Sequence, residues 1–275
     1  MPDYLSNDPP PTGGTPASTQ HVVLTSAGES LHGVLHLPPG DGPHPVTLLL
    51  HGFPGWERNF DIAQALRRAG VATLVFHYRG CWGMPGTWSW ANALADTREV
   101  LAQLLSGELE TSPGLDSTRV AVVGHSLGGF LALMAAAQEP AVRVTASIAG
   151  FDFGAVAAAI AADPALHHDY VEAFELETPV LTGTDGATLA REMQAAGQTW
   201  SLRALAADLA DRDVLLIGTS CDPVTRAGIH HLPLVEAFSQ GHIRLQHALF
   251  ATDHSLSDHR VQLTRHVVSF VSQRL

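Results

Sequence analysis

Residues 120–129 decide the fold, and they read Val120-Ala121-Val122-Val123-Gly124-His125-Ser126-Leu127-Gly128-Gly129. An apolar, β-branched run enters a tight Gly-His-Ser-Leu-Gly turn, and a helix-forming run follows from Phe130 to Ala137. A strand, a sharp turn and a helix are the context that a G-x-S-x-G nucleophile elbow requires. The two flanking glycines leave room for a serine in a strained backbone conformation. The stretch therefore predicts a nucleophilic Ser126, against the alternative of a glycine-rich turn with an ordinary serine.

The rest of the chain alternates buried strands with helices. Short continuous apolar runs, typical of strands that are buried on both faces, occur at Val46–Leu50, Val71–Phe76, Val144–Ala149 and Val214–Ile217. Further strands are expected at His21–Thr25, Leu31–Leu37 and Arg244–Phe250, and helices at Asp61–Ala69, Trp90–Leu105 and Ser257–Gln273. This alternation predicts an α/β fold with a mainly parallel central sheet and helices on both faces.

The chain divides into three parts by composition. Residues 1–20 are rich in Pro, Gly, Ser and Thr and lack a basic region followed by an apolar one, so we expect a disordered tail and not a signal peptide. Residues 21–150 and 213–275 form the strand-and-helix core. Residues 151–212 are too long for a simple connection and are alanine-rich, with helical spacing at 155–162, 165–174, 187–196 and 202–209. We interpret them as a helical cap inserted over the carboxyl ends of the strands, where open α/β sheets bind ligands.

Composition excludes several classes of protein. The chain has 275 residues, is 45% hydrophobic and carries a formal net charge of -12, so a surface that binds nucleic acid or anionic lipid is not expected. Its apolar runs fall short of the roughly 20 residues that span a bilayer. The two cysteines, Cys81 and Cys221, make no disulfide framework, which favours a cytoplasmic location.

The elbow calls for a base and an acid further along the chain. On a sheet of this kind the order is serine, then Asp or Glu, then histidine. Asp222 follows the strand Val214–Ile217, and His254 follows the strand Arg244–Phe250, so both are expected in loops at the same edge of the sheet. Asp152, after the preceding strand, is the alternative acid, and Asp222 is favoured.

Donors for a developing oxyanion can be placed in the same way. Leu127, directly after the serine, and Phe53, in the loop after the first parallel strand, each offer a backbone N–H. Trp82 and Trp88 are candidates for the wall of a substrate pocket. The pairs His167-His168 and His230-His231 lack the i, i+4 facing of helical zinc sites, so we expect no metal and no cofactor.

Five motifs carry a family resemblance: His51-Gly52-Phe53-Pro54-Gly55, His77-Tyr78-Arg79-Gly80-Cys81-Trp82-Gly83, Gly124-His125-Ser126-Leu127-Gly128-Gly129, Cys221-Asp222-Pro223-Val224 and Asp253-His254-Ser255. Together they resemble the α/β-hydrolase superfamily, and more closely the bacterial serine esterases and the catalytic domains of dipeptidyl- and acylaminoacyl-peptidases. The resemblance covers about residues 21–275. It implies an α/β-hydrolase fold with Ser126, Asp222 and His254 as the triad and Phe53 and Leu127 at the oxyanion positions.

The sequence thus predicts a cofactor-free serine hydrolase that cleaves small to medium carboxylic esters through an acyl-enzyme. The partner is then a small-molecule ester, with no nucleic acid or membrane. Two alternatives stay open: a short-peptide aminopeptidase or amidase of the same fold, and a non-catalytic protein that binds a hydrophobic ligand beneath the cap. The sequence leaves the acyl and alcohol groups and the oligomeric state undetermined.

Overall fold

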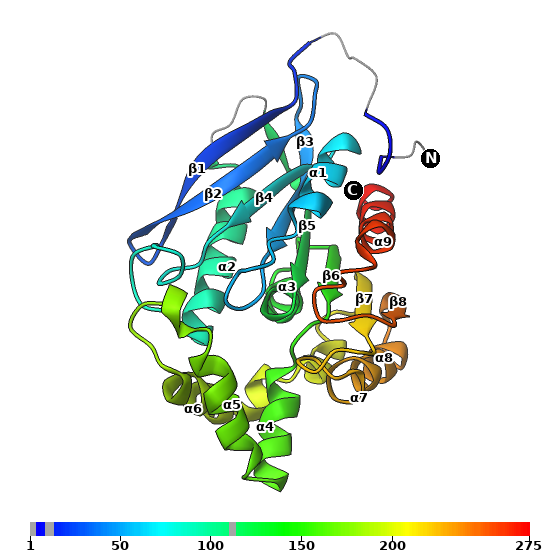
Figure 1. The fold of residues 1–275 in the computed structure, drawn as a ribbon. Helices are drawn as coiled ribbons and strands as arrows, with labels where there is room; N and C mark the ends of the chain where they lie inside the picture. The colour runs from blue at the N-terminus through cyan, green and yellow to red at the C-terminus, as the bar shows by residue number, and fades with distance from the viewer. Residues whose placement is uncertain (1–3, 9–13, 110–113) are drawn as a thin grey trace.

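An eight-stranded sheet in the order β1-β2-β4-β3-β5-β6-β7-β8 crosses the computed structural model, which describes residues 4–8, 14–109 and 114–275 (Figure 1). The strands are β1 (Ser18–Ser26), β2 (Glu29–Leu37), β3 (His44–Leu50), β4 (Ala72–Phe76), β5 (Leu115–His125), β6 (Val144–Ile148), β7 (Asp213–Thr219) and β8 (Arg244–Phe250). The pairs β1–β2 and β2–β4 are antiparallel, and all later neighbours are parallel. The mainly parallel sheet is confirmed.

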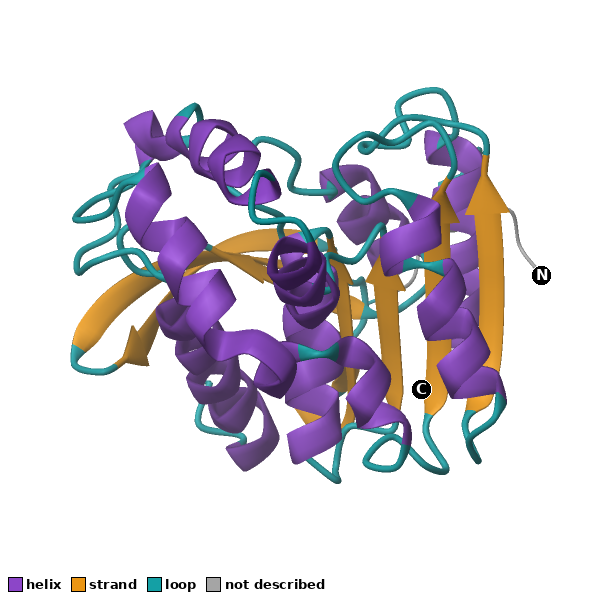
Figure 2. Ribbon diagram, turned by 90° about the horizontal axis from the view of Figure 1, so that it is seen from below, coloured by secondary structure: helices purple, strands orange, loops and turns teal. Residues whose placement is uncertain are grey.

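Helices cover both faces of this sheet (Figures 1 and 2). One face carries α1 (Phe60–Arg68) and α9 (Arg260–Ser272), and the other carries α2 (Trp90–Ser106), α3 (Leu127–Gln138) and α8 (Leu232–Ser239). Successive side chains of β5 alternate between the faces: Val120 and Val122 join one apolar cluster, and Ala121 and Val123 join the other. A strand buried on both faces needs a continuous apolar run, which explains the sequence pattern. No described helix is both long and apolar enough to cross a membrane.

Residues 151–212, which we call the cap segment, lie beyond the carboxyl ends of the central strands (Figure 1). They contain α4 (Phe153–Ala162), α5 (Leu166–Glu175), α6 (Gly186–Ala196) and the short 3-10 turns η1 (Thr178–Val180), η2 (Gly197–Trp200) and η3 (Leu202–Ala206). The helix expected at 202–209 was wrong. The Leu202 N–H donates to the Asp152 carboxylate at 3.3 Å, and the chain turns at Asp211 (φ 59°) to enter β7, so only a short 3-10 turn forms there.

The N-terminal segment contributes to the fold. Strand β1 begins at Ser18, within the segment expected to be a tail. The Thr15 hydroxyl donates to Asp41 at 2.8 Å, and Tyr4 and Leu5 pack against the cluster beneath α1 and α9. Residues 1–3 and 9–13 of the expected tail lie outside the described residues.

A buried ion pair joins three parts of the core. Asp96 on α2 is fully buried and accepts hydrogen bonds from the Arg79 backbone N–H at 2.8 Å and from the Arg79 Nε at 2.7 Å. The Ser26 hydroxyl donates to the same carboxylate at 2.6 Å. These contacts tie β1, the loop after β4 and α2 together, and they satisfy a charge that burial would otherwise make unfavourable.

Removing the acid should therefore leave an uncompensated buried guanidinium. We expect Asp96→Ala to lower the free energy of unfolding by about 3–5 kcal/mol, measured by urea denaturation. Asp116→Ala is the matched control, because its partner Arg119 is 44% exposed and such pairs contribute little. Equal losses in the two variants would contradict the structural role given to Asp96.

Candidate active site

Ser126 lies between β5 and α3 in a backbone conformation that few non-glycine residues adopt. Its φ is 57° and its ψ is -118°, and its N–H donates to the Ile148 carbonyl of the neighbouring strand at 2.8 Å. The turn leaves no space for side chains beside it. A Cβ at Gly128 would lie 2.1 Å from the Leu50 carbonyl oxygen, and a Cβ at Gly124 would lie 1.9 Å from the Gly128 carbonyl oxygen. Both glycines are therefore required for the helix to start this close to the sheet.

Asp222 and His254 meet at the same edge of the sheet. The His254 Nδ1 lies 2.7 Å from the Asp222 Oδ2. The Thr219 hydroxyl donates to the same oxygen at 2.8 Å, while the backbone N–H groups of Val224 and Thr225 donate to Oδ1 at 2.7 and 3.0 Å. Burial acts to raise the pKa of Asp222, but the hydrogen bonds from His254 and Thr225 outweigh it and hold the pKa well below its usual range. Asp222 is thus an ionised carboxylate in a fixed orientation.

His125, the residue before the serine, supports the loop that carries His254. The His125 Nε2 donates to the His254 backbone carbonyl at 2.8 Å, and the two rings lie 4.9 Å apart. Burial lowers the pKa of His125 to about 3, so the ring is neutral and keeps this proton. Among the described contacts no hydrogen bond joins the Ser126 hydroxyl to the His254 ring; such contacts often tighten only with substrate.

Asp152, the alternative acid, has different partners. Its carboxylate caps α4 by accepting from the Ala155 N–H at 3.0 Å, and it also accepts from the Leu202 N–H. Its own N–H donates to the His230 Nδ1 at 2.9 Å. Asp152 therefore joins α4, Leu202 and His230, and Asp222 is the carboxylate that contacts the His254 ring.

Two backbone N–H groups adjoin the serine. Leu127 and Phe53 line the same cavity as Ser126, and neither N–H donates to another described group. The loop that carries Phe53 passes close to the nucleophile, since a Cβ at Gly52 would lie 2.9 Å from the Ser126 Cβ. The arrangement can present both donors to an oxygen bound beside the serine.

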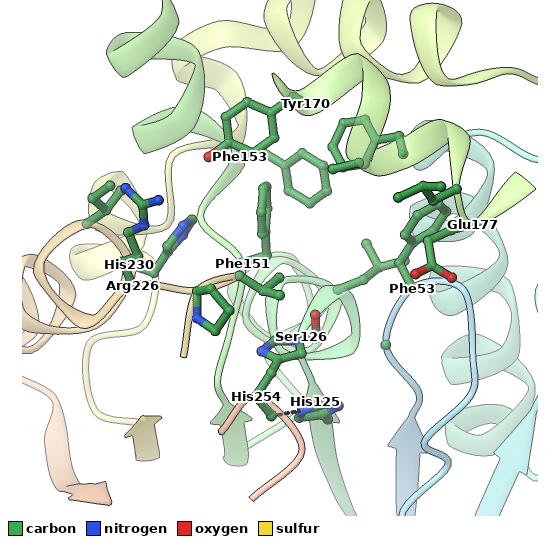
Figure 3. A pocket seen from close by; sticks show the side chains of 18 of the residues that line it. Phe53, His125, Ser126, Phe151, Phe153, Tyr170, Glu177, Arg226, His230 and His254 are labelled. Atoms are coloured by element: carbon green, nitrogen blue, oxygen red, sulfur yellow. Dashed lines mark hydrogen bonds between the residues drawn. The ribbon is translucent and has the colours of Figure 1, made fainter. Parts of the chain in front are cut away.

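Above these groups lies a cavity of about 560 Å³ between the core and the cap segment (Figure 3). Its wall is largely aromatic, contributed by Phe53, Trp90, Phe151, Phe153, Tyr170 and Phe174. Several of these rings contact one another, such as Phe53 and Trp90 at 4.7 Å. A cavity of this size with a mainly apolar wall fits a small organic ligand.

Trp82 and Trp88 do not line this cavity, which corrects the expectation from the sequence. Trp88 is only 1% exposed and contributes to the core beneath the Phe53 ring. Trp82 has a φ of 51°. Its Nε1 donates to the Pro54 carbonyl at 2.8 Å, and its ring packs against the Trp56 ring in an edge-to-face contact. Trp56 and Trp90 line the cavity, and Trp56 lies in a loop, where no periodic signal marks it.

One described group of side chains could hold a metal ion. His51, His77 and Cys81 each bring a ligand atom within 4.8 Å of the others. Hydrogen bonds already account for these atoms, since the His51 and His77 rings bond at 3.3 Å and the Cys81 thiol donates to the Tyr78 carbonyl at 3.0 Å. Burial and then the positive charge of Arg58 lower the pKa of His77 to about 4, and the same Arg58 charge would repel a metal cation.

The geometry can now be compared with known proteins. The family model described as "Alpha/beta hydrolase family" matches residues 47–265. The chain belongs to this family. The match includes all three residues of the candidate triad, and the family assignment and the fold expected from the sequence are confirmed.

Among curated proteins, an uncharacterised protein of Mycobacterium tuberculosis is 34% identical over 141 residues, which cover 50% of this chain and 48% of that protein. The esterase FrsA of Klebsiella pneumoniae is 29% identical over 128 residues, which cover 46% of this chain and 30% of that protein. The chain thus matches less than half the length of these relatives.

Two solved structures share the fold. An esterase of Pyrococcus furiosus has a TM-score of 0.69 at 14% identity and covers 97% of each chain. An acylaminoacyl peptidase of Pyrococcus horikoshii has a TM-score of 0.68 at 17% identity, covering 95% of this chain and 42% of that one. At these identities the likeness shows the fold, and it leaves the substrate undetermined.

Buried neutral histidines around the site give a pH prediction. Burial lowers the pKa of His125 to about 3 and that of His230 to about 4, while an unfolded histidine titrates near roughly 6.5. Between these values the unfolded chain binds more protons than the folded one, so the free energy of unfolding should fall as the pH drops from about 6.5 towards 4.

Urea denaturation at several pH values measures this slope. His125→Gln, whose side-chain amide nitrogen reaches about as far as the imidazole Nε2 and can still donate to the His254 carbonyl, should make the slope shallower. His168→Gln is the control and should leave the slope unchanged, because the His168 side chain is 75% exposed. A wild-type stability that stays constant between about pH 6.5 and 4.5 would refute the prediction.

Proposed function

We propose that the protein is a serine hydrolase that cleaves carboxylic esters of small to medium size through an acyl-enzyme intermediate. The observation that carries the proposal is the position of Ser126. It lies on a strained turn (φ 57°, ψ -118°) at the base of an aromatic cavity, and His254, oriented by Asp222, lines the same cavity. Three groups with these relations are the arrangement that nucleophilic acyl transfer requires.

The reaction follows from the hydrogen bonds. The His254 Nδ1–H donates to the Asp222 carboxylate, which leaves Nε2 free to accept a proton. As the Ser126 Oγ bonds to the ester carbon, its proton passes to Nε2, and Asp222 stabilises the imidazolium that forms. The oxyanion is held by the N–H groups of Phe53 and Leu127.

The protonated His254 then gives its proton to the alkoxide as the ester C–O bond breaks, leaving the acyl group on Ser126. A water molecule then gives a proton to His254 and attacks the acyl carbon. The protonated His254 returns this proton to the Ser126 Oγ as the bond between that oxygen and the acyl carbon breaks, and the carboxylic acid is released. Every proton is accounted for by one imidazole, so the scheme uses no cofactor.

The volume of the cavity supports an ester of small to medium size, and its lining bears on the aminopeptidase alternative. About 560 Å³ with an aromatic wall suits an acyl or alcohol group of modest length. A short-peptide aminopeptidase would need a carboxylate for the substrate amine, and the carboxylates of Glu57, Asp169 and Glu177 line the cavity, so the comparison of esters with aminoacyl anilides decides between the two activities. We also propose a cytoplasmic location, which two free cysteines support.

The nucleophile can be tested directly. Wild-type protein should react with a fluorophosphonate probe and hydrolyse p-nitrophenyl esters faster than aminoacyl anilides. Ser126→Ala should lose labelling and lose on the order of 10⁴-fold or more in kcat, because the acyl-enzyme cannot form. Ser255→Ala is the control for a serine that lines the same cavity. If the wild-type protein is not labelled by the probe and hydrolyses neither the esters nor the anilides, the non-catalytic ligand-binding alternative is favoured.

The acid is tested by a matched pair of isosteric changes. Asp222→Asn keeps the shape but favours the wrong tautomer of His254, and should cost about 10⁴-fold in kcat. Asp152→Asn should cost less than about tenfold, because that carboxylate contacts α4 and Leu202. Circular dichroism confirms that both variants fold. The reverse order of losses would move the role of the acid to Asp152.

A further inference from the structure

One end of the cavity presents hydrogen-bond donors that the reaction scheme does not use. The first is His230, which is 2% exposed and lines the cavity. The Asp152 backbone N–H donates to the His230 Nδ1 at 2.9 Å, so Nδ1 must carry the lone pair and Nε2 must carry the proton. Burial lowers the pKa of His230 to about 4, which keeps the ring neutral. No described residue accepts a hydrogen bond from this Nε2–H.

Two more donors lie beside this ring. The Tyr170 side chain, from α5 of the cap segment, and the Arg226 side chain, from the loop after Asp222, line the cavity with His230. Figure 3 shows these three side chains at one end, on the side away from Glu177. Among the described contacts neither the Tyr170 hydroxyl nor the Arg226 guanidinium has a hydrogen-bond or ion-pair partner.

The charges along the cavity are arranged asymmetrically. Glu57 and Glu177 line it with Trp56, and the Glu177 carboxylate accepts from the Trp56 Nε1. Arg226 is the cation among the described lining residues, and Asp169, on the same wall as Tyr170, is exposed and makes no described ion pair with it. At the Glu177 end an anionic group would meet two carboxylates, whereas at the other end the Arg226 guanidinium attracts it against the repulsion of Asp169 alone, whose charge acts on Tyr170. The long apolar wall between the ends would hold an aliphatic or aromatic arm.

We propose that Arg226, Tyr170 and His230 form a carboxylate-binding subsite, and that the preferred substrates are esters with a carboxylate at the far end of an apolar arm. A guanidinium matches the two carboxylate oxygens, and a phenol and a neutral imidazole N–H add donors without adding charge. The inference rests on the proposed function for its substrate class. Arg226 is thus the residue that determines specificity, while Ser126, Asp222 and His254 carry out the chemistry.

Matched ester pairs test the subsite. On the acyl side, p-nitrophenyl monoesters of adipic, suberic and sebacic acid are compared with the p-nitrophenyl esters of the corresponding monoamides, which differ only in charge. On the alcohol side, butyryl esters of para-hydroxybenzoate and para-hydroxybenzamide make the same comparison. We expect kcat/KM to favour the carboxylate member of at least one pair by about tenfold or more.

The variants assign that preference to named side chains. Arg226→Gln should bring the carboxylate-to-amide ratio of kcat/KM close to one, Arg226→Lys should retain part of it, and Tyr170→Phe should lower it less. Arg265→Gln, on α9 and outside the cavity lining, is the matched control and should keep the wild-type ratio. A ratio near one in the wild type, or one that Arg226→Gln leaves unchanged, overturns the subsite while ester hydrolysis itself stands.

A binding measurement separates this inference from the proposed reaction. Titration calorimetry on Ser126→Ala compares suberamate with suberamide, so no turnover is needed. Tighter binding of suberamate that Arg226→Gln abolishes supports the subsite even if no ester is hydrolysed, in which case only the proposed function fails. If Ser126→Ala binds suberamate and suberamide equally, or if the Arg226→Gln change leaves a difference between them unaltered, the subsite is overturned.

Discussion

The close approach of α3 to the sheet is the constraint on which the site depends. A non-glycine residue with the φ of 57° and ψ of -118° seen at Ser126 costs on the order of 1–3 kcal/mol, and it persists only when its surroundings leave no alternative. Here the Ser126 N–H donates to Ile148, and the Ser126 carbonyl accepts from the N–H groups of Gly129, Phe130 and Phe151. Contacts from β6, from α3 and from the start of the cap segment therefore hold the turn from both sides.

The other members of the candidate triad are held by contacts of different range. Asp222 is fixed by its own loop, through the hydroxyls of Thr219 and Thr225 and two backbone N–H groups. His254 depends on a longer-range contact, because the His125 ring donates to its carbonyl from within the elbow. The elbow thus positions the nucleophile and, through the neighbouring residue, the loop of the base. This explains how loops after β5, β7 and β8 can meet at one edge of a parallel sheet.

The core and the loop positions of the candidate site residues could be predicted from the sequence because each depends on local patterns. The apolar run before Gly124, the order of Ser126, Asp222 and His254, and the loop positions follow from single segments. The wall of the cavity depends on side-chain directions that local patterns do not set. Trp82 and Trp88 resemble Trp56 and Trp90 in the sequence, but a positive φ and a hydrogen bond to Pro54 turn Trp82 away.

The hydrogen-bond donors at the Arg226 end of the cavity also could not be predicted from local sequence patterns. The sequence presents His230 only as a possible metal ligand, because its sequence neighbours give no sign of the Asp152 N–H that fixes its tautomer. Tyr170 and Arg226 come from separate segments and meet only in the folded chain. A donor cluster assembled across the cap boundary has no spacing that a single sequence could reveal.

The boundary between core and cap segment passes through the cavity wall itself. Trp90 belongs to the core, yet its Nε1 donates to the Leu189 carbonyl at 3.0 Å, and the Glu192 carboxylate accepts from the backbone N–H groups of Trp90 and Ala91. Both acceptors lie on α6, so the cap segment sets the orientation of a core side chain that would contact the substrate. Among the described contacts the candidate triad receives no hydrogen bond from α6. Changes in α6 can therefore reshape the cavity through Trp90 while the geometry around Ser126 is retained, which separates the selection of substrate from the chemistry.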